Sequence, residues 1–353
     1  MSGLRRVLLA LLVALAVMGS ATLAATASSA GASAAPQVHH KKKHHHKKKH
    51  HKKKRQHKLK VPTKAPVKPA ATSCPVFPAD NWWNRDVSRL PVSADSARWM
   101  AAMSPGRDLH PDFGGSYGIP VTTVTPTHAQ VPVAFDYADE SDRVGYPLGA
   151  DTRVEGGRDS GGDMHAIVVD RSACRLWETW DTTESSGHWR AGSGATWSLR
   201  SNALRPDGWT SADAAGLPIY PGLLRYDEAK AGRVTHAIRF TTDVSSSHHL
   251  WPARHDAGSQ ADWHSYPPMG ARFRLRSTYD ESGYSPMAKA VLTAMKRYGM
   301  VLADNGSPWF FQGAQDSRWP DAFVEEMKHV PASALEAVET SSLRVSSSSA
   351  ATR

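Results

Sequence analysis

Between residues 131 and 275 the apolar and polar positions alternate in the manner of short, half-buried strands. Apolar and aromatic runs are separated at short intervals by clusters of Pro, Gly, Asp and Ser. The predicted strands cover residues 131–137, 165–170, 174–181, 196–199, 223–226, 236–242 and 271–275. This spacing favours a mainly β single domain, built as a sandwich or jelly roll.

Two or three helices are expected at the periphery of this domain. The clearest covers residues 286–298, where Ser285 suits the N-cap, Pro286 the first helical position and Gly299 the terminator. Weaker helical patterns cover residues 94–103 and 321–329. The β-rich domain is expected over residues 74–338, followed by a disordered tail over residues 339–353.

The first 27 residues have the pattern of a secretory signal peptide. Arg5 and Arg6 precede an apolar run from Val7 to Val17, and small residues follow. The run is shorter than the roughly 20 residues that a bilayer-spanning helix needs. We therefore expect a secreted protein, extracellular or cell-wall associated, with no transmembrane segment.

The positive charge of the chain is confined to its N-terminal part. Residues 1–73 hold 16 Lys or Arg and no Asp or Glu, whereas the remaining 280 residues hold 27 Lys or Arg and 33 Asp or Glu. Residues 39–60 consist mainly of alternating His and Lys blocks, with 8 His and 12 Lys or Arg. Such a composition cannot form a core, so residues 28–73 are expected to be a disordered basic segment with a Pro-containing linker.

Three interpretations of residues 39–60 remain open. The favoured one is electrostatic binding to an anionic cell-wall polymer or another polyanion. Metal binding is the second, because His-rich tracts bind Zn²⁺ or Cu²⁺, and its candidate ligands are His44, His45, His46, His50 and His51. A charged spacer is the third. No aromatic residues interleave the charges, so specific recognition of nucleic acid is not expected.

Cys74 and Cys174 are the two cysteines of the chain, and they are predicted to form a disulfide. An even cysteine count in a secreted protein favours pairing. The bond would tie the first residue of the domain to a central strand. Two unpaired buried thiols are the alternative.

Tryptophans and carboxylates in the middle of the domain indicate carbohydrate chemistry. The chain has 12 Trp, all within the domain, and several stand beside Asp, Glu or Asn. An indole ring packs on the C–H face of a pyranose while polar neighbours bind its hydroxyls. Burial in the core is the commoner fate of a Trp, and we expect it for most of the twelve.

Glycoside hydrolysis requires two carboxyl groups that flank the scissile bond, one of which keeps its proton near neutral pH. The candidate catalytic residues are Glu178, Glu228, Asp163, Glu155 and His165. The candidate substrate-binding residues are Trp180, Arg225, Asp213, Trp251 and Asn305. Glu178 or Glu228 would be the general acid and Asp163 or Glu155 the base or nucleophile. For each acid, a turn, a helix cap or an ion pair is the competing role.

The sequence thus predicts a secreted glycan-active enzyme, associated with the cell wall or a polyanion, that acts as a glycoside hydrolase on a polysaccharide. The alternative is a non-catalytic carbohydrate-binding or surface structural protein. No cofactor is expected, and no metal site in the domain. Motifs of serine hydrolases, zinc proteases and phosphate-binding loops are absent from the sequence.

An ordered series of segments resembles a recurrent domain of secreted bacterial proteins. The segments are GGDMHAIVVD, RPDGWTSADAAGLPIYPGLLRYDE, LWPARH, PPMGARFRL and YGMVLADNGSPWFF. The resemblance covers nearly all of residues 76–338. It implies that the domain is an independently occurring unit to which the His/Lys-rich segment has been added, and it implies no particular reaction.

Overall fold

The computed structural model describes residues 74–353. The predicted signal peptide and the His/Lys-rich segment, with its candidate metal ligands, lie outside the described residues. The strands are β1 (His110–Asp112), β2 (Val121–Val124), β3 (Val133–Phe135), β4 (Ala166–Asp170), β5 (Arg175–Trp180), β6 (Thr183–Ser185), β7 (His188–Ala191), β8 (Ser193–Ser198), β9 (Ile238–Thr242), β10 (Arg272–Leu275), β11 (Met300–Asn305), β12 (Phe310–Gln312) and β13 (Leu335–Val338). The helices are α1 (Ser96–Ala102), α2 (Tyr226–Lys230), α3 (Pro286–Arg297) and α4 (Asp321–Met327). Strand residues outnumber helix residues, so the mainly β prediction is confirmed.

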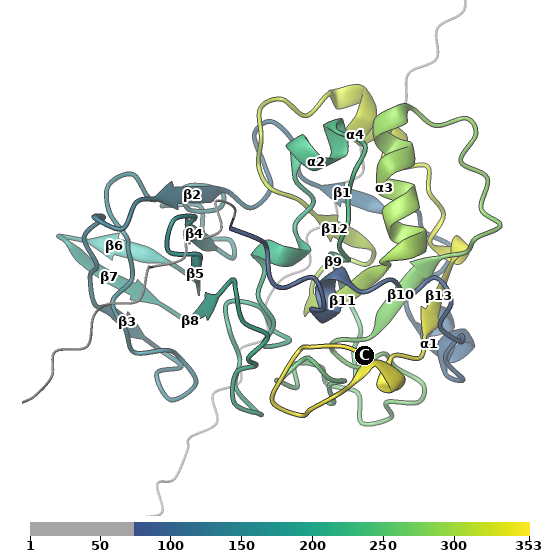
Figure 1. Ribbon diagram of the computed structural model, residues 1–353, viewed down its shortest axis with the longest axis horizontal. Coiled ribbons are helices and arrows are strands. Elements are labelled where there is room, and N and C mark those ends of the chain that lie inside the picture. Colours follow the sequence, from purple (N-terminus) through teal and green to yellow (C-terminus); the bar gives the residue numbers. More distant parts are fainter. Residues whose placement is uncertain (1–73) are drawn as a thin grey trace, which may run out of the picture. The chain divides into compact units, whose positions relative to one another are not determined.

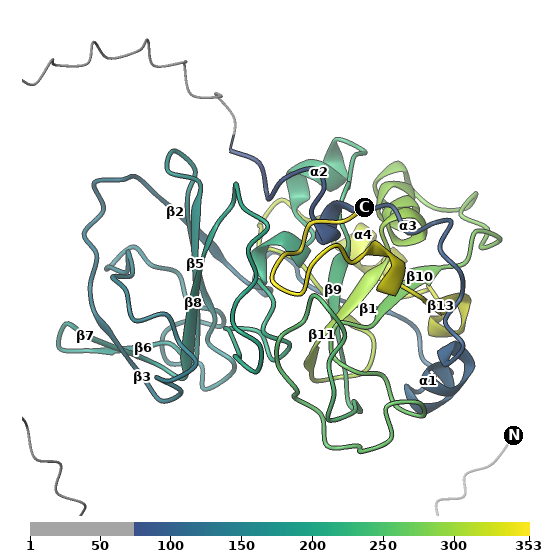
Figure 2. The same cartoon turned by 60° about the horizontal axis from the view of Figure 1, so that its bottom comes forward.

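The strands form three sheets. A six-stranded sheet has the order β1-β12-β9-β11-β10-β13, a four-stranded sheet the order β2-β4-β5-β8, and a three-stranded sheet the order β3-β7-β6. Figures 1 and 2 show the two smaller sheets together on one side and the six-stranded sheet with the helices on the other. The β1–β12, β9–β11, β2–β4 and β3–β7 pairs are parallel. A jelly roll is antiparallel, so that finer prediction is not confirmed.

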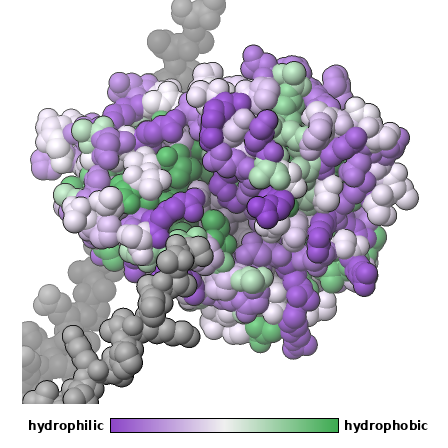
Figure 3. Space-filling view, turned by 45° about the horizontal axis from the view of Figure 1, so that its top comes forward, coloured by the Kyte–Doolittle hydropathy of each residue, from purple (hydrophilic) through white to green (hydrophobic). Residues whose placement is uncertain are grey.

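The four-stranded sheet is buried on both faces. Ile167 and Leu176 point into the main core, which also contains Phe240 of the six-stranded sheet. Val168 and Trp177, one residue further along each strand, belong to a smaller core shared with the three-stranded sheet. Burial on both faces explains why β4 is a continuous apolar run rather than an alternating one. On the face drawn in Figure 3, hydrophilic residues surround smaller apolar patches.

Helix α3 confirms the prediction made from its capping residues. The Ser285 hydroxyl accepts a hydrogen bond from Ala288 N at 3.3 Å, and Gly299 has the positive φ of 75° expected after a helix end. Val291 and Met295 are fully buried, which confirms the predicted apolar stripe. The helix therefore has a structural role in packing beside β10.

Two predicted elements are corrected. Residues 223–226 were expected to form a strand, but Leu224 makes one isolated bridge to Gly313 and α2 begins at Tyr226. The reason is local: the Glu228 carboxylate accepts a hydrogen bond from Arg225 N at 2.9 Å and so caps a helix.

The C-terminal residues 339–353 were expected to be disordered, and instead they lie on the domain. Trp82 N donates to Ala350 O at 2.8 Å, and Ala350 N donates to Asn202 O at 2.7 Å. Leu343 is buried. Backbone hydrogen bonds to segments far away in the sequence hold this Ser-rich stretch on the domain. Its composition alone does not indicate such pairing.

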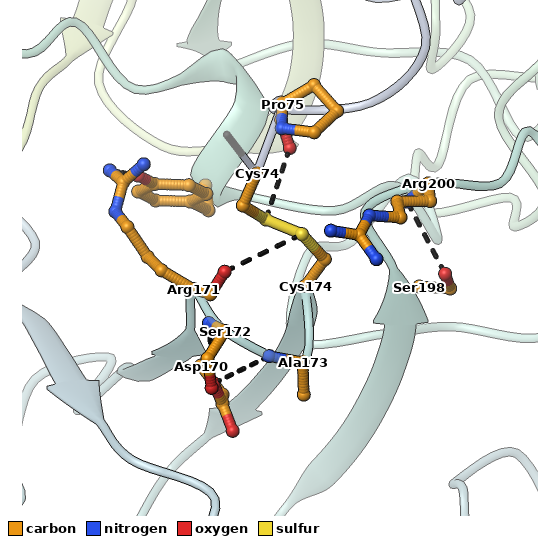
Figure 4. The surroundings of a disulfide bond; sticks show 10 residues. Cys74, Pro75, Asp170, Arg171, Ser172, Ala173, Cys174, Ser198 and Arg200 are labelled. Atoms are coloured by element: carbon orange, nitrogen blue, oxygen red, sulfur yellow. Dashed lines mark hydrogen bonds between the residues drawn. A yellow bond between two sulfur atoms is a disulfide. The ribbon is translucent and has the colours of Figure 1, made fainter. Parts of the chain in front are cut away.

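The predicted disulfide between Cys74 and Cys174 is present, with a Cα–Cα distance of 5.5 Å. Figure 4 shows Cys174 after the turn that follows Asp170, whose carboxylate accepts hydrogen bonds from Ser172 N and Ala173 N. Cys174 directly precedes β5, which lies between β4 and β8. The bond therefore ties the start of the domain to an interior strand, as predicted.

Candidate functional site

A pocket opens where β4 begins and β5 ends, and we call it the carboxylate pocket. Its cavity volume is about 280 Å³. The residues that line it are Tyr137, Glu140, Asp163, Trp180, Ser193, Thr210, Ser211, Ala212, Asp213, Ala214, His255 and Asp304. Three residues predicted from sequence, Asp163, Trp180 and Asp213, therefore lie in one cavity.

The β4–β5 hairpin brings Asp163 and Trp180 together. The two strands are antiparallel, so the residues before β4 lie beside those after β5. Asp181 N accordingly donates to Asp163 O at 2.9 Å. Trp180 is paired with Ser193 of β8, and a Cβ at Gly192 would lie 2.2 Å from the Trp180 ring. The absence of a side chain at Gly192 thus makes room for the indole.

Asp304 reaches the pocket from the six-stranded sheet because β11 contains a β-bulge. The parallel register of β9 and β11 shifts after Leu302, so that Asp304 rather than Ala303 pairs with Thr241. Arg239 and Thr241 share one face of β9 because strand side chains alternate. The bulge therefore places the Asp304 side chain on the face that carries Arg239.

Arg239 joins two carboxylates of the pocket. Its side chain is fully buried. The guanidinium Nη2 lies 3.0 Å from Asp213 Oδ2 and 3.4 Å from Asp304 Oδ2. Nη1 donates to Gln312 Oε1, which comes from the neighbouring strand β12. One fully buried cation thus faces two acids, of which Asp213 is fully buried and Asp304 is 23% exposed toward the pocket.

Burial controls the protonation of these two acids. It raises the pKa of Asp213 to about 7, although the Arg239 charge opposes the effect. Burial also raises the pKa of Asp304, again against Arg239. A single guanidinium does not offset two buried carboxylates. The pair therefore keeps a proton at pH values where an exposed Asp has lost it.

Asp163 and Glu140 are the more accessible carboxylates of the pocket. The Asp163 side chain is exposed and makes no hydrogen bond or ion pair with the described residues 74–353. Glu140 accepts a hydrogen bond from Thr210 N at 2.9 Å, and its carboxylate lies 3.9 Å from His255 Nε2. The pocket thus combines a proton-holding pair with an acid that is free to contact a ligand.

Two aromatic rings complete the pocket wall. The centroids of Tyr137 and Trp180 are 6.3 Å apart, and the ring planes are tilted by 44°. Tyr137 is 51% exposed, so its ring is accessible to a ligand in the pocket. Trp180 is partly buried and also lines the pocket, so both rings offer an apolar face against which a ligand can pack.

Glu155 and His165 form a pair behind the pocket. His165 Nδ1 lies 2.5 Å from Glu155 Oε2, and Nε2 lies 3.1 Å from the carbonyl oxygen of Ala212. Burial alone would lower the pKa of His165, but the Glu155 carboxylate outweighs it and the pKa is raised. Both ring nitrogens are therefore occupied, and His165 positions the segment that carries Asp213.

Glu178 is a structural anchor in the main core. It is fully buried, and its two carboxylate oxygens accept hydrogen bonds from Ile219 N and Tyr220 N, each at 2.8 Å. Burial raises the pKa of Glu178 to about 7 against these two donors. The carboxylate holds the segment after the pocket loop and does not line the pocket.

Glu228 and Arg225 pair with each other away from the carboxylate pocket. Glu228 Oε2 lies 2.7 Å from Arg225 Nη2, and Glu228 Oε1 lies 2.8 Å from His236 Nε2. Burial would raise the pKa of Glu228, but the charges of His236 and Arg225 lower it to about 2. Glu228 is thus ionised at neutral pH and caps α2.

The other two predicted binding residues stabilise loops. Trp251 Nε1 donates to Ser349 O at 3.0 Å and so holds the C-terminal segment. The Asn305 side chain donates to Ala257 O at 2.8 Å and accepts from the Ser245 hydroxyl at 2.6 Å. Neither residue lines the carboxylate pocket.

Sequence reasoning did not assign a site role to Arg239, Glu140 or Tyr137. The sequence carried one signal for Arg239: an arginine in the middle of the apolar run HAIRFTT needs a buried counter-charge. For Asp304, in Asp304-Asn305-Gly306, the sequence leaves a groove position and a turn equally open, because the orientation of its side chain depends on the bulge.

Within residues 74–353 no group of three or more His, Cys, Asp or Glu side chains is arranged to hold a metal ion. None of the helices in that part of the chain has the length and apolarity of a bilayer-spanning helix. Comparisons of the chain with protein-family models, curated proteins and solved structures gave no match. A function for this chain is therefore proposed from the geometry of the carboxylate pocket.

Proposed function

We propose that this protein is a secreted glycan-active enzyme, a glycoside hydrolase that uses paired carboxylates in the carboxylate pocket. The observation that carries the proposal is the meeting of Asp163, Asp213 and Asp304 with the Trp180 ring in one cavity. A hydrolase of this kind needs one protonated and one ionised carboxyl on either side of a sugar.

Asp304 is the proposed general acid, and Asp163 the proposed base or nucleophile. The Asp304 side chain is 23% exposed, and its pKa is raised by burial. Asp213 is fully buried beside the same guanidinium nitrogen, so its charge favours the protonated form of Asp304. Asp163 is exposed and unpaired within residues 74–353, as a group that attacks a sugar carbon or activates a water must be.

This assignment keeps the sequence prediction of Asp163 as base or nucleophile and replaces Glu178 or Glu228 by Asp304 as the general acid. Both oxygens of Glu178 are occupied by backbone N–H groups. The pKa of Glu228 is about 2, so at neutral pH it has no proton to donate. Glu155 is paired with His165 behind the cavity wall. Asp304 combines a raised pKa with access to the cavity.

Secretion and attachment to an anionic polymer are part of the proposal. The apolar run after Arg5 and Arg6 supports export. The Cys74–Cys174 bond is of the kind that forms outside the cytoplasm. Residues 39–60, with 12 Lys or Arg, would bind the cell wall through its negative charge.

The test is a panel of polysaccharides that includes bacterial wall glycans, assayed for new reducing ends. We expect the wild type to cleave at least one glycan, and Asp163→Asn and Asp304→Asn each to lower kcat by about 100-fold or more. Asp139→Asn is the matched control, because Asp139 is exposed one residue from Glu140 and does not line the pocket. Thermal unfolding of each variant establishes that it is folded.

Two results would overturn the proposal. If no glycan gains reducing ends but one binds with Trp180-dependent affinity, the protein is a carbohydrate-binding module without catalysis. If a glycan is cleaved and both variants retain wild-type kcat, the active site lies elsewhere.

A further inference from the structure

The ionisable side chains around the carboxylate pocket are almost all acidic. Four of its lining residues, Glu140, Asp163, Asp213 and Asp304, carry carboxyl groups. Among the described residues 74–353, His255 is the one lining residue with a basic side chain, and neither Lys nor Arg lines the cavity. Asp213 is fully buried and shares a proton with Asp304, so the ionised carboxylates that a ligand meets in this cavity are those of Asp163 and Glu140.

The buried guanidinium of Arg239 does not cancel the negative charge at the cavity surface. Arg239 is fully buried, and its hydrogen-bonding groups are directed to Asp213, Asp304 and Gln312. Its single charge balances the Asp213–Asp304 pair, which keeps one proton, and is not directed at Asp163 or Glu140. Asp163 and Glu140 are both accessible, and within residues 74–353 the one ion-pair partner of either carboxylate is His255, at 3.9 Å from Glu140.

The aromatic wall adds a second, independent preference for positive charge. The ring faces of Tyr137 and Trp180 carry negative electrostatic potential, and cations within about 6 Å of such a ring are attracted to it. The rings lie 6.3 Å apart, and both border the cavity. The same rings pack against pyranose C–H groups, so they suit a sugar that carries a cation.

We propose that the glycan bound in the carboxylate pocket carries free amino groups, as a polymer of glucosamine does. This inference rests on the proposed function and names the substrate class of that site. A protonated amino group would contact Asp163 or Glu140 while its pyranose ring packs on Trp180. Uronic acid and sulfated sugars are excluded, because their charges would face the same carboxylates at short range.

The experiment measures calorimetric binding of three tetrasaccharides to the full chain carrying Asp304→Asn, which prevents turnover. The probes are tetramers of glucosamine, N-acetylglucosamine and galacturonic acid. We expect the glucosamine tetramer to bind most tightly, with an advantage over the acetylated tetramer that shrinks at high salt because the attraction is screened. Adding Glu140→Gln should weaken its binding by about three- to fivefold, the size of an accessible ion pair.

Asp139→Asn is again the control, because it removes the same charge without altering the cavity. Equal or tighter binding of the acetylated tetramer, binding of the acidic tetramer that Trp180→Ala weakens and that therefore does not come from the basic residues 39–60, or cleavage of neutral or acidic glycans alone would overturn this inference and leave the hydrolase proposal standing. If the protein binds and cleaves none of the glycans, the proposed function fails with it. Binding of polylysine with no glycan binding would also overturn the inference, since the cavity would then recognise amino groups outside sugars.

Discussion

Arg239 and Asp304 come from neighbouring parallel strands, and a one-residue bulge in β11 brings the Asp304 carboxylate to 3.4 Å from the Arg239 guanidinium. Asp213, from a loop 26 residues before Arg239, reaches the same nitrogen at 3.0 Å. The buried cation therefore joins the six-stranded sheet to the loop that lines the carboxylate pocket. Loss of the Arg239 charge should therefore lower the stability of the fold and change the pKa values of Asp213 and Asp304 at the same time.

Replacement of Arg239 by Met should lower the free energy of unfolding by about 3–5 kcal/mol, because buried carboxylates lose their cation. Adding Asp213→Asn should recover part of that loss, since it removes one uncompensated acid. Urea unfolding of the two single variants and the double variant gives the coupling energy. Losses that add to within about 0.5 kcal/mol would mean that the two side chains act independently.

The Glu155–His165 pair should make stability depend on pH. The raised pKa of His165 stabilises the fold below its ordinary value of 6.5, and this contribution is lost as pH rises through the raised value. The pKa of Glu155 is lowered, because its contacts with His165 outweigh the effect of burial. Its contribution to the stability of the fold is therefore present above pH 4.5 and is lost as the pH falls. The Glu155–His165 pair therefore stabilises the fold most between about pH 4.5 and pH 6.5.

Glu155→Gln should lower the pKa of His165, because burial then acts on the imidazolium without a carboxylate beside it. An NMR titration of the His165 ring measures this directly, and unfolding at several pH values gives the matching loss of stability. Asp159→Asn, an exposed acid in the same loop, should leave the titration unchanged. An unaltered His165 titration in Glu155→Gln would show that the contact does not set the protonation state.

Local sequence signals predicted several parts of the fold. Ser285, Pro286 and Gly299 fix the bounds of α3 within a few residues, and each acts on its immediate neighbours. The β4–β5 hairpin was predicted from its two apolar runs, and its register places Ile167 opposite Glu178. The disulfide followed from the cysteine count.

The candidate site was predictable only in part, because its geometry depends on contacts between distant segments. Asp163 and Trp180 were recognised because one hairpin holds both. The sequence predicts Glu178 as a catalytic acid, and this prediction fails because its hydrogen-bond donors, Ile219 N and Tyr220 N, lie more than 40 residues away and cannot be read from a strand pattern. Asp304 was not recognised as an acid of the site, because no local pattern announces a bulge.

Removal of the disulfide should destabilise the domain strongly. The bond joins residues 100 positions apart, and a loop of that length corresponds to about 4–5 kcal/mol in the chain-entropy model. The double variant Cys74→Ser, Cys174→Ser should lose about this amount in urea unfolding. Reduced wild-type protein is the control and should match the variant. Equal stability of oxidised wild type and variant would mean that the bond constrains an already compact unfolded state.

The contacts of Glu228 with Arg225 and His236 should set how far the free energy of unfolding falls at acidic pH. Its carboxylate is 16% exposed and lies 2.7 Å from Arg225 Nη2 and 2.8 Å from His236 Nε2. The pKa of Glu228 falls from 4.5 to about 2 on folding. Its ionised carboxylate therefore adds to the free energy of unfolding above pH 4.5, and this contribution is lost as the pH falls toward 2. It amounts to about 3 kcal/mol.

Glu228→Gln should therefore be about 3 kcal/mol less stable than the wild type at neutral pH, and the difference should vanish as pH approaches 2. Urea unfolding across this range measures both curves. Glu325→Gln is the control, because its ion pair with Lys328 on α4 is exposed and such pairs contribute little. A difference between Glu228→Gln and wild type that stays constant with pH would assign the loss to helix capping by Glu228 rather than to its charge.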